Sequence, residues 1–289
     1  MQTQRIGIIG LGRMGSAMAE RLASEGFSVT GWTRRGVNEE QAAALGFRPA
    51  ADLAGLVEAA DILILSLMDD AAVESVLGEL ERLDLSGRLV VETSTVSPNI
   101  LPAHRTALAA AGAQAIDAPI SGGPDQVRQG SIGLYIGGDA DNVARFMPVA
   151  ERLSNRIHHI GPLGHGAAAK LVNNMMLLGL WQTLKEALQL GQAAGLTRET
   201  MLRFLETSPA ASPALRSRLP VILGESDSVG FSLSGVAKDA GVVMDLARAL
   251  NLTLPAMIAA RQSFVDAEQA GLGEKDLATM VRAATESEG

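Results

Sequence analysis

Hydrophobic residues in the first half of the chain form short runs that alternate with helical patterns. An apolar run at 5–9 leads into a helical pattern at 16–23, and a second run follows at 27–32. Later strand-like runs cover residues 60–66, 88–93, 113–118 and 131–137. Helical patterns lie at 39–45, 71–83 and 98–111. Strands that alternate with helices predict an α/β domain with a doubly wound, mainly parallel sheet.

From residue 165 onward the pattern changes to long amphipathic stretches without a strand signal. These stretches cover residues 167–194, 198–206, 234–251, 254–270 and 275–284. We therefore divide the chain near Gly161. The division predicts a sheet-based domain at 1–161 and an all-α domain at 162–289 that begins with a long helix.

The first apolar run continues directly into a glycine-rich turn, Gly10-Leu11-Gly12-Arg13-Met14-Gly15. In such a motif Gly10 makes the tight turn, Gly12 lets a pyrophosphate approach the backbone, and Gly15 lets the helix pack close to the strand. The helix N-terminus offers N–H groups and the positive end of its dipole to the phosphates. Because the motif lies between a strand and a helix, it predicts a Rossmann-type dinucleotide-binding domain whose cofactor contacts all six residues.

The residues after the second strand indicate which dinucleotide binds. An NAD site usually has Asp or Glu there to accept from the ribose 2′-OH, whereas this chain has Thr33-Arg34-Arg35. Guanidinium groups suit a 2′-phosphate, which Arg binds through charge-assisted pairs. The alternative is that one or both arginines only solvate a surface loop. We expect NADP, with NAD as the second possibility. Leu67, Met68 and Thr95 follow two other strands, where cofactors bind in such sheets.

A serine and two glycines, Ser121-Gly122-Gly123, follow the strand at 113–118 and lie between two prolines. Such a segment exposes backbone N–H groups and one hydroxyl, which suits a carboxylate or another oxyanion. By itself, the segment is equally compatible with an ordinary tight loop.

Lys170 and Asn174 stand four residues apart on the long predicted helix, so they share a helix face. A lysine among Ala, Leu and Met either reaches solvent at the edge of that face or is partly desolvated. Desolvation lowers the pKa of a lysine toward the operating pH, as a proton donor to a reduced carbonyl requires. An ordinary surface lysine is the alternative.

Taken together, these segments resemble the β-hydroxyacid dehydrogenases, which include 3-hydroxyisobutyrate dehydrogenase, tartronate semialdehyde reductase and the glyoxylate/succinic semialdehyde reductases. The segments occur in the order seen in that family, over nearly the whole chain. They are Gly10-x-Gly12-x-x-Gly15, Leu67-Met68, Ser94-Thr95, Asp117-x-Pro119-x-Ser121-Gly122-Gly123, Gly164-x-Gly166-x-x-x-Lys170-x-x-x-Asn174 and Lys238-Asp239.

The resemblance implies roles for individual residues. Lys170 would be the general acid/base and Asn174 its hydrogen-bonding partner, while Ser121, Gly122 and Gly123 would hold the substrate carboxylate. Three residues of the second domain would line the cleft: Phe231 over the nicotinamide region, Lys238 near the cofactor and Asp239 near Lys170. The chain departs from the family at Thr33, where Asn or Asp is common.

Composition narrows the class of protein further. Among 289 residues, Lys and Arg number 24 and Asp and Glu 32, which gives a net charge of −8. This charge disfavours a general nucleic-acid binder, which would have a basic face. Without cysteine the chain has no disulfide or thiolate metal site, and we expect no metal. We also expect no signal sequence, no membrane span and a cytoplasmic location.

These features predict an NADPH-dependent reductase of small carboxylated aldehydes or ketones, reversible to oxidation of the β- or γ-hydroxy acid. An imine reductase-like enzyme is one alternative, but such enzymes usually lack the lysine at the position of Lys170. A non-catalytic NADP-binding scaffold is another, although this chain keeps both Lys170 and the Ser121–Gly123 loop. Apolar residues run almost all round the helix at 175–181, which predicts a homodimer or a homotetramer.

Overall fold

The computed structural model of the chain describes residues 4–285 and divides into two compact units. We call Met1–Lys170 the sheet unit and Leu171–Gly289 the helical unit. This division falls inside the long helix, and the domain boundary near Gly161 stays a prediction.

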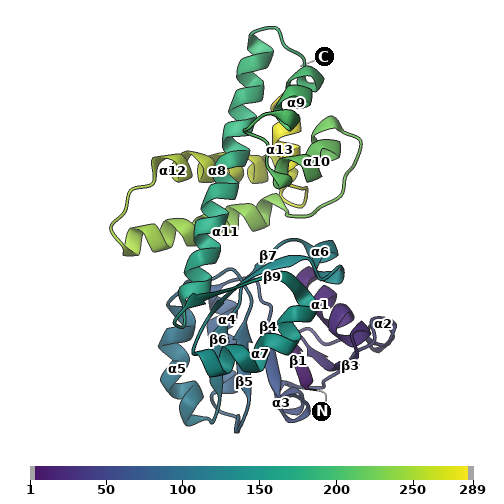
Figure 1. The fold of residues 1–289 in the computed structure, drawn as a ribbon, viewed down its shortest axis with the longest axis vertical. Coiled ribbons are helices and arrows are strands. Elements are labelled where there is room, and N and C mark those ends of the chain that lie inside the picture. The colour runs from purple at the N-terminus through teal and green to yellow at the C-terminus, as the bar shows by residue number, and fades with distance from the viewer. Residues whose placement is uncertain (1–3, 286–289) are drawn as a thin grey trace. The chain divides into compact units, whose positions relative to one another are not determined.

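The sheet unit is built on nine strands (Figure 1), and the first six are parallel to one another. Their order is β3-β2-β1-β4-β5-β6-β8-β7, and β9 pairs with β8. The strands are β1 (Arg5–Ile9), β2 (Ser28–Trp32), β3 (Arg48–Pro49), β4 (Ile62–Leu65), β5 (Leu89–Glu92), β6 (Gln114–Asp117), β7 (Ile120–Ser121), β8 (Ile132–Gly137) and β9 (Ser154–Gly161). β8 runs antiparallel to β6 and β7 and parallel to β9. Starting from β1, the chain therefore adds β2 and β3 on one side of the sheet and β4, β5 and β6 on the other side.

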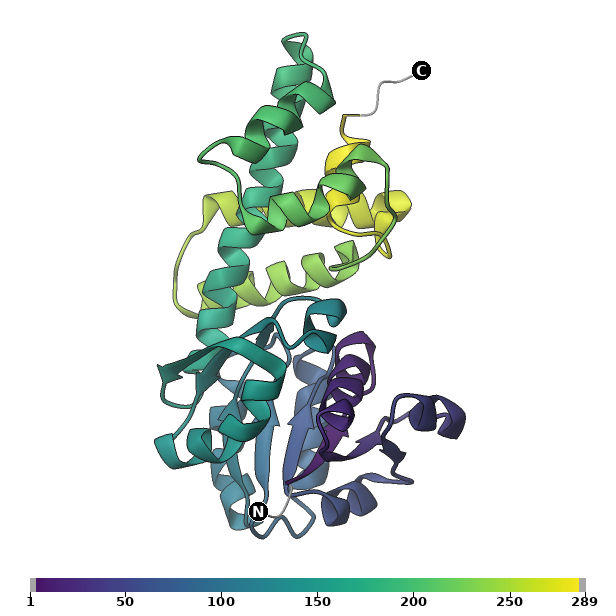
Figure 2. The same ribbon diagram turned by 45° about the vertical axis from the view of Figure 1, so that its right-hand side comes forward.

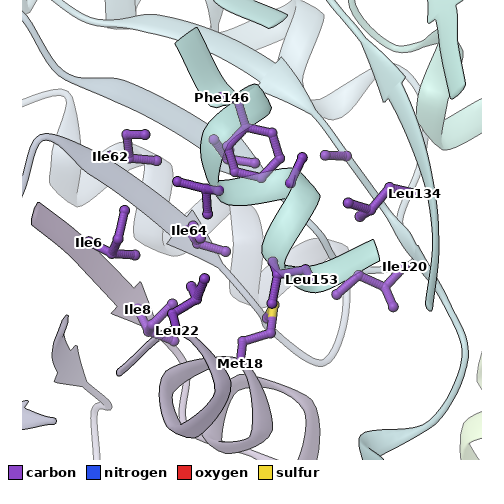
Figure 3. Close-up of a cluster of buried hydrophobic side chains, with 14 of the residues drawn as sticks. Ile6, Ile8, Met18, Leu22, Ile62, Ile64, Ile120, Leu134, Phe146 and Leu153 are labelled. Carbon is purple, nitrogen blue, oxygen red and sulfur yellow. The ribbon is translucent and has the colours of Figure 1, made fainter. Parts of the chain in front are cut away.

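Helices cover both faces of this sheet because successive side chains of a strand point to opposite faces. The helices are α1 (Arg13–Ser24), α2 (Glu39–Ala44), α3 (Leu53–Ala59), α4 (Asp70–Leu80), α5 (Ile100–Ala110), α6 (Pro124–Arg128) and α7 (Ala140–Leu153). On one face, Ile6 and Ile8 of β1 belong to the same buried cluster as Met18 of α1 and Phe146 of α7 (Figure 3). On the other face, Ile9 packs in a second cluster with residues of α3, α4 and α5.

The helical unit contains no strand among residues 171–285 (Figure 2). Its helices are α8 (His165–Ala193, which begins in the sheet unit), α9 (Arg198–Thr207), α10 (Pro213–Leu223), α11 (Leu233–Ala249), α12 (Pro255–Ala267) and α13 (Ala278–Ala283). A kinked segment, Glu268–Leu272, follows α12, with Gly271 at φ +86°. α11 and α12 lie side by side, and Trp181 of α8 and Phe264 of α12 are fully buried in the core of this unit.

Buried Asp276 holds the segment before α11 against the segment before α13. Its carboxylate accepts hydrogen bonds from the backbone N–H groups of Gly230, Phe231 and Ala278 at 2.9–3.0 Å. The guanidinium of Arg218 lies 3.1 Å from the same carboxylate and neutralises its charge. One buried acid thereby fixes the position of Phe231 within the helical unit.

The architecture confirms the fold class predicted from the sequence, a doubly wound sheet followed by an all-α region on a long helix. Every expected strand and helix is present with its ends shifted by a few residues. No helix among residues 4–285 combines the length and the apolar character that crossing a bilayer requires.

Candidate cofactor and substrate site

The glycine-rich turn after β1 has the local geometry of a phosphate-binding turn. Gly10 has φ +96°, which favours glycine, and its N–H donates to the Trp32 carbonyl at 2.8 Å. A Cβ on Gly15 would collide with the carbonyl oxygen of Gly10, so the first turn of α1 lies directly on the backbone of the preceding turn. Gly15 therefore serves close packing of helix and strand.

Gly12 differs from its two neighbours in the motif because space is open around it. A Cβ built on Gly12 meets no atom of the described residues within 4 Å. The first turn of α1 carries no acidic residue, and its N-cap residue, Gly12, makes no side-chain capping bond. These features fit the pyrophosphate of a dinucleotide, which needs backbone access and uncapped N–H groups.

Four strand ends meet at one edge of the sheet. The pairing register aligns Ile9 with Trp32 and Leu65, and Leu65 with Glu92. The residues that follow these strands are the predicted cofactor contacts: Gly10–Gly15, Thr33–Arg35, Leu67 with Met68, and Thr95. The N–H of Leu67 donates to Oγ of Ser94 at 2.9 Å, which ties two of these segments together. The edge includes the point between β1 and β4 where ligands bind in doubly wound sheets.

Arg34 is already paired within the sheet unit. Its Nη2 lies 3.0 Å from Oγ of Ser75 and 3.0 Å from Oε1 of Glu79, both on α4. The Arg34 side chain is 62% exposed, and an ion pair this exposed contributes little to stability. A phosphate that approaches Arg34 would therefore displace the Glu79 carboxylate at a small cost in protein stability.

The Ser121–Gly123 loop joins β7 to α6, and Ser121 is the last residue of β7. Gly122 has φ +147°, which lies in the region that favours glycine. The N–H of Gly123 donates to Oε1 of Gln126 at 2.8 Å. A substrate carboxylate that binds this N–H must therefore compete with the Gln126 side chain.

Asp117, at the end of β6, holds the beginning of α8. Its Oδ1 accepts from the N–H of Gly164 at 2.6 Å, and its Oδ2 accepts from the N–H of Ala167 at 2.6 Å. Burial raises the pKa of Asp117 above its ordinary value, and hydrogen bonds from Gly164, Ala167 and Gly166 oppose this rise. The carboxylate is thus a buried acid whose partners are backbone N–H groups.

Lys170 and Asn174 occupy successive turns of α8. Lys170, the last residue of the sheet unit, is only 8% exposed, and Asn174 in the helical unit is fully buried. Nδ2 of Asn174 donates to Oδ2 of Asp239 at 2.7 Å. Oδ1 of Asn174 has no hydrogen-bond partner among the described residues, although it is buried. The amide thus presents an acceptor that a ligand or a nearby donor can satisfy.

Asp239 also pairs with its neighbour on α11. Nζ of Lys238 lies 2.9 Å from Oδ1 of Asp239, so the two carboxylate oxygens serve Lys238 and Asn174 separately. The structure therefore brings three predicted site residues of the helical unit into one hydrogen-bonded group. Phe231, the fourth, precedes α11 and is held by its N–H bond to Asp276.

Two buried carboxylates of the sheet unit were not among the predicted site residues. Glu92, at the end of β5, is paired in register with Asp117, and its two oxygens accept from the N–H of Ser94 at 2.9 and 3.0 Å. Glu92 and Asp117 line one small cavity together with Gly164 and Ala167. The available sequence signal is an acidic residue that directly ends an apolar strand run.

Comparison with known proteins identifies relatives over nearly the whole chain. Residues 5–161 match the NAD-binding domain of 6-phosphogluconate dehydrogenase. Residues 164–284 match the domain described as NAD-binding of NADP-dependent 3-hydroxyisobutyrate dehydrogenase. The 2-(hydroxymethyl)glutarate dehydrogenase of Eubacterium barkeri is 30% identical, over 96% of this chain and 94% of that protein.

Solved structures agree with this placement. The 3-hydroxyisobutyrate dehydrogenase of Mycobacterium tuberculosis with L-serine superposes with a TM-score of 0.87 at 25% identity, covering 99% of this chain and 100% of that one. An imine reductase from Myxococcus stipitatus in complex with NAD⁺ has a TM-score of 0.67 at 22% identity, covering 97% and 99% of the two chains. The imine reductase shares the fold.

The contrast between Gly12 and Gly15 gives a test of the nicotinamide cofactor site. Gly12→Ala should weaken NAD(P)H binding by about tenfold or more, equivalent to about 1.4 kcal/mol, because the new Cβ occupies space that the pyrophosphate needs. Its melting temperature should fall by at most a few degrees, since an exchange at a helix N-cap costs about 1 kcal/mol.

Gly15→Ala is the matched control. Its Cβ collides with the Gly10 carbonyl, so this variant should lose stability, by about 1–3 kcal/mol. Cofactor titration by fluorescence and thermal melts measure both effects. Unchanged cofactor affinity in a folded Gly12→Ala protein would contradict the assignment of this turn.

Proposed function

Because this chain belongs to the β-hydroxyacid dehydrogenase family, we propose that it transfers a hydride between NADP(H) and a small carboxylated aldehyde or ketone. The reverse reaction oxidises the matching β- or γ-hydroxy acid. Family membership establishes an NAD(P)-dependent oxidoreductase that acts on CH–OH groups. The observation that carries the finer proposal is the buried Lys170 one turn before Asn174, whose amide is oriented by Asp239.

Lys170 is the proposed general acid/base. When bound, the cofactor supplies the hydride, and the protein supplies binding, orientation and the proton. In the reduction, Nζ of Lys170 gives a proton to the carbonyl oxygen of the substrate; in the oxidation it takes that proton back. Burial supports this role because a proton donor in a dry site competes with few water molecules.

Asn174 is proposed to orient the groups that exchange the proton. Nδ2 of Asn174 donates to Asp239, which leaves Oδ1 of Asn174 as the acceptor at the other end of the amide. A buried acceptor without a partner costs about 1–3 kcal/mol, which the hydroxyl of a substrate can offset. The Lys238–Asp239 pair holds the amide in this orientation.

The Ser121–Gly123 loop is proposed to bind the substrate carboxylate. It offers backbone N–H groups and one hydroxyl at a turn whose conformation depends on Gly122. A carboxylated substrate agrees with the names of the relatives, since 2-(hydroxymethyl)glutarate and 3-hydroxyisobutyrate are both hydroxy acids.

Two other functions explain fewer of these features. An imine reductase shares the fold, but Lys170 disfavours this alternative because such enzymes usually place another residue there. A non-catalytic NADP-binding scaffold has no need for a buried lysine next to an oriented amide.

Arg34 is the proposed basis of a preference for NADP over NAD. It lies at the end of β2 beside the predicted ribose site, and no acidic residue stands at 33–35 to bind a 2′-OH. The exposed Glu79 is the group that a 2′-phosphate would replace.

A homodimer, or a tetramer of dimers, is the proposed assembly. Val172, Met176 and Leu190 are exposed large apolar residues of α8, and Met176 and Leu190 are each 74% exposed. Their spacing places them on one face of the helix. An apolar face along one helix favours burial against a second copy of the chain.

Lys170→Ala tests the acid/base role. Turnover should fall by about 10²-fold or more while the affinity for NADPH stays nearly unchanged. Lys185→Ala is the control, because Lys185 lies on the same helix and donates to Ser263 at 2.6 Å. Steady-state kinetics with a panel of small semialdehydes and keto acids provide the measurement. Turnover of Lys170→Ala within about threefold of wild type would exclude Lys170 as the proton donor.

Arg34→Ala tests the cofactor preference. Loss of a charge-assisted contact costs about 1.5–3 kcal/mol, so NADPH affinity should fall by about tenfold or more and NADH affinity should barely change. Glu79→Ala removes the same surface ion pair but keeps Arg34, and it should not weaken NADPH binding. Equal losses for both cofactors in Arg34→Ala would show that Arg34 does not contact the 2′-phosphate.

Sedimentation tests the assembly. The protein at micromolar concentration should sediment as a dimer or a tetramer of the 30.1 kDa chain. Leu190→Glu should shift this equilibrium toward the monomer, because it places a charge in the proposed contact. A wild-type protein that sediments only near 30.1 kDa contradicts the proposal.

A further inference from the structure

Asp117 connects two parts of the sheet unit that lie far apart in the sequence. It ends β6, four residues before Ser121, and its two oxygens accept from the N–H groups of Gly164 and Ala167. The first N–H groups of a helix have no partner within the helix. A carboxylate satisfies them and also interacts favourably with the positive end of the helix dipole. The start of α8 is therefore attached to the end of β6 by one buried side chain.

The surroundings of this carboxylate leave the first turn of α8 little freedom to shift. A Cβ on Gly166 would collide with the Tyr135 carbonyl and lie 2.8 Å from Oδ2 of Asp117. A Cβ on Gly137 of β8 would lie 2.5 Å from Oδ1 of Asp117. The two glycines also lie against each other, because a Cβ on Gly137 would lie 2.7 Å from the backbone nitrogen of Gly166, so strand and helix pack closely beside the carboxylate. Asp117 is only 2% exposed as a result.

The attachment determines where Lys170 lies. Lys170 follows Ala167 by three residues, less than one helical turn, and both belong to the sheet unit. Asp117 is also the last residue of β6, and a short segment connects it to the Ser121–Gly123 loop. A displacement at Asp117 would therefore move the lysine relative to this loop.

We propose that Asp117 is a positioning residue that sets the Lys170 ammonium relative to the Ser121–Gly123 loop through the first turn of α8. This inference rests on the proposed role of Lys170 as the general acid/base. Asp117 itself touches neither substrate nor cofactor in this proposal. Its effect on the reaction passes entirely through the backbone of Gly164 to Ala167.

Asp117→Asn is the most conservative test. The side-chain volume is kept, but the amide NH₂ places a donor against one of the two backbone N–H donors. We expect kcat to fall by about 10- to 100-fold, since a small misplacement of a reacting group has an effect of this size. The Kd for NADPH should stay within about threefold, because the glycine-rich turn after β1 is not part of the attachment.

A double-mutant cycle separates positioning from a general structural effect. In the Lys170→Ala background, Asp117→Asn should have almost no further effect on the residual turnover, since the group that it positions is gone. A reduction of the residual turnover by the same factor as in the wild-type background would overturn the proposal. Normal turnover of Lys170→Ala alone would instead refute the underlying acid/base assignment, so the two failures are distinguishable.

Asp52→Asn is the matched control. Oδ1 of Asp52 accepts from the N–H of Gly55 at 2.7 Å and caps α3, which carries no proposed site residue. Because the Asn amide oxygen can accept the same single bond, this variant should leave both the melting temperature and kcat nearly unchanged. A comparable loss of kcat in Asp52→Asn would show that an Asp-to-Asn exchange at any helix N-terminus, and not the position of Lys170, reduces the activity.

Hydrogen exchange provides a second measurement if Asp117→Asn does not fold. In the wild-type protein, the amide protons of Gly164 and Ala167 should exchange far more slowly than those of exposed loops, because both donate to a buried carboxylate. Rapid exchange at both amides in the folded wild-type protein would overturn the proposal without any variant.

Discussion

The structure depends on direct contact between backbones at two of the places where a helix begins at the sheet edge. At the start of α1, Gly15 lies against the carbonyl of Gly10 with no room for a side chain. At the start of α8, Gly166 lies against Tyr135 and the carboxylate of Asp117 in the same way. In both places the backbone of the first helical turn is in direct contact with the backbone of a strand or of the turn that follows it. The first of these termini belongs to the proposed phosphate-binding turn, whereas the second is bonded to the carboxylate of Asp117.

Much of this fold follows from the order of apolar runs. The central strands β1, β4 and β5 are buried on both faces, so each is a short uninterrupted apolar run. Other elements gave no such signal. β3 has two exposed residues, and β9 is mostly exposed with no regular alternation. The helix α7 was not among the predicted elements, although Val143, Phe146, Ala150 and Leu153 have helical spacing.

In the candidate site too, some features are predictable from neighbouring residues in the sequence, and others depend on contacts that only the folded chain makes. The glycine-rich turn is predictable because its function requires a strand, a turn and a helix that are consecutive in sequence. Asp117 is different, because its partners Gly164 and Ala167 lie 47 and 50 residues farther along the chain. The orientation of the Asn174 amide depends on Asp239, 65 residues away. Only the folded chain shows which acid holds which donor.

Two groups of the sheet unit that are proposed to bind ligands already have partners within the protein. The N–H of Gly123 is bonded to Gln126, and the guanidinium of Arg34 is bonded to Glu79. Ligand binding at these groups is an exchange of one oxygen acceptor for another. Both internal bonds are exposed, so giving them up would subtract only a small part of the binding energy of the ligand. In the absence of a ligand, the internal partners hold these two segments in a defined conformation.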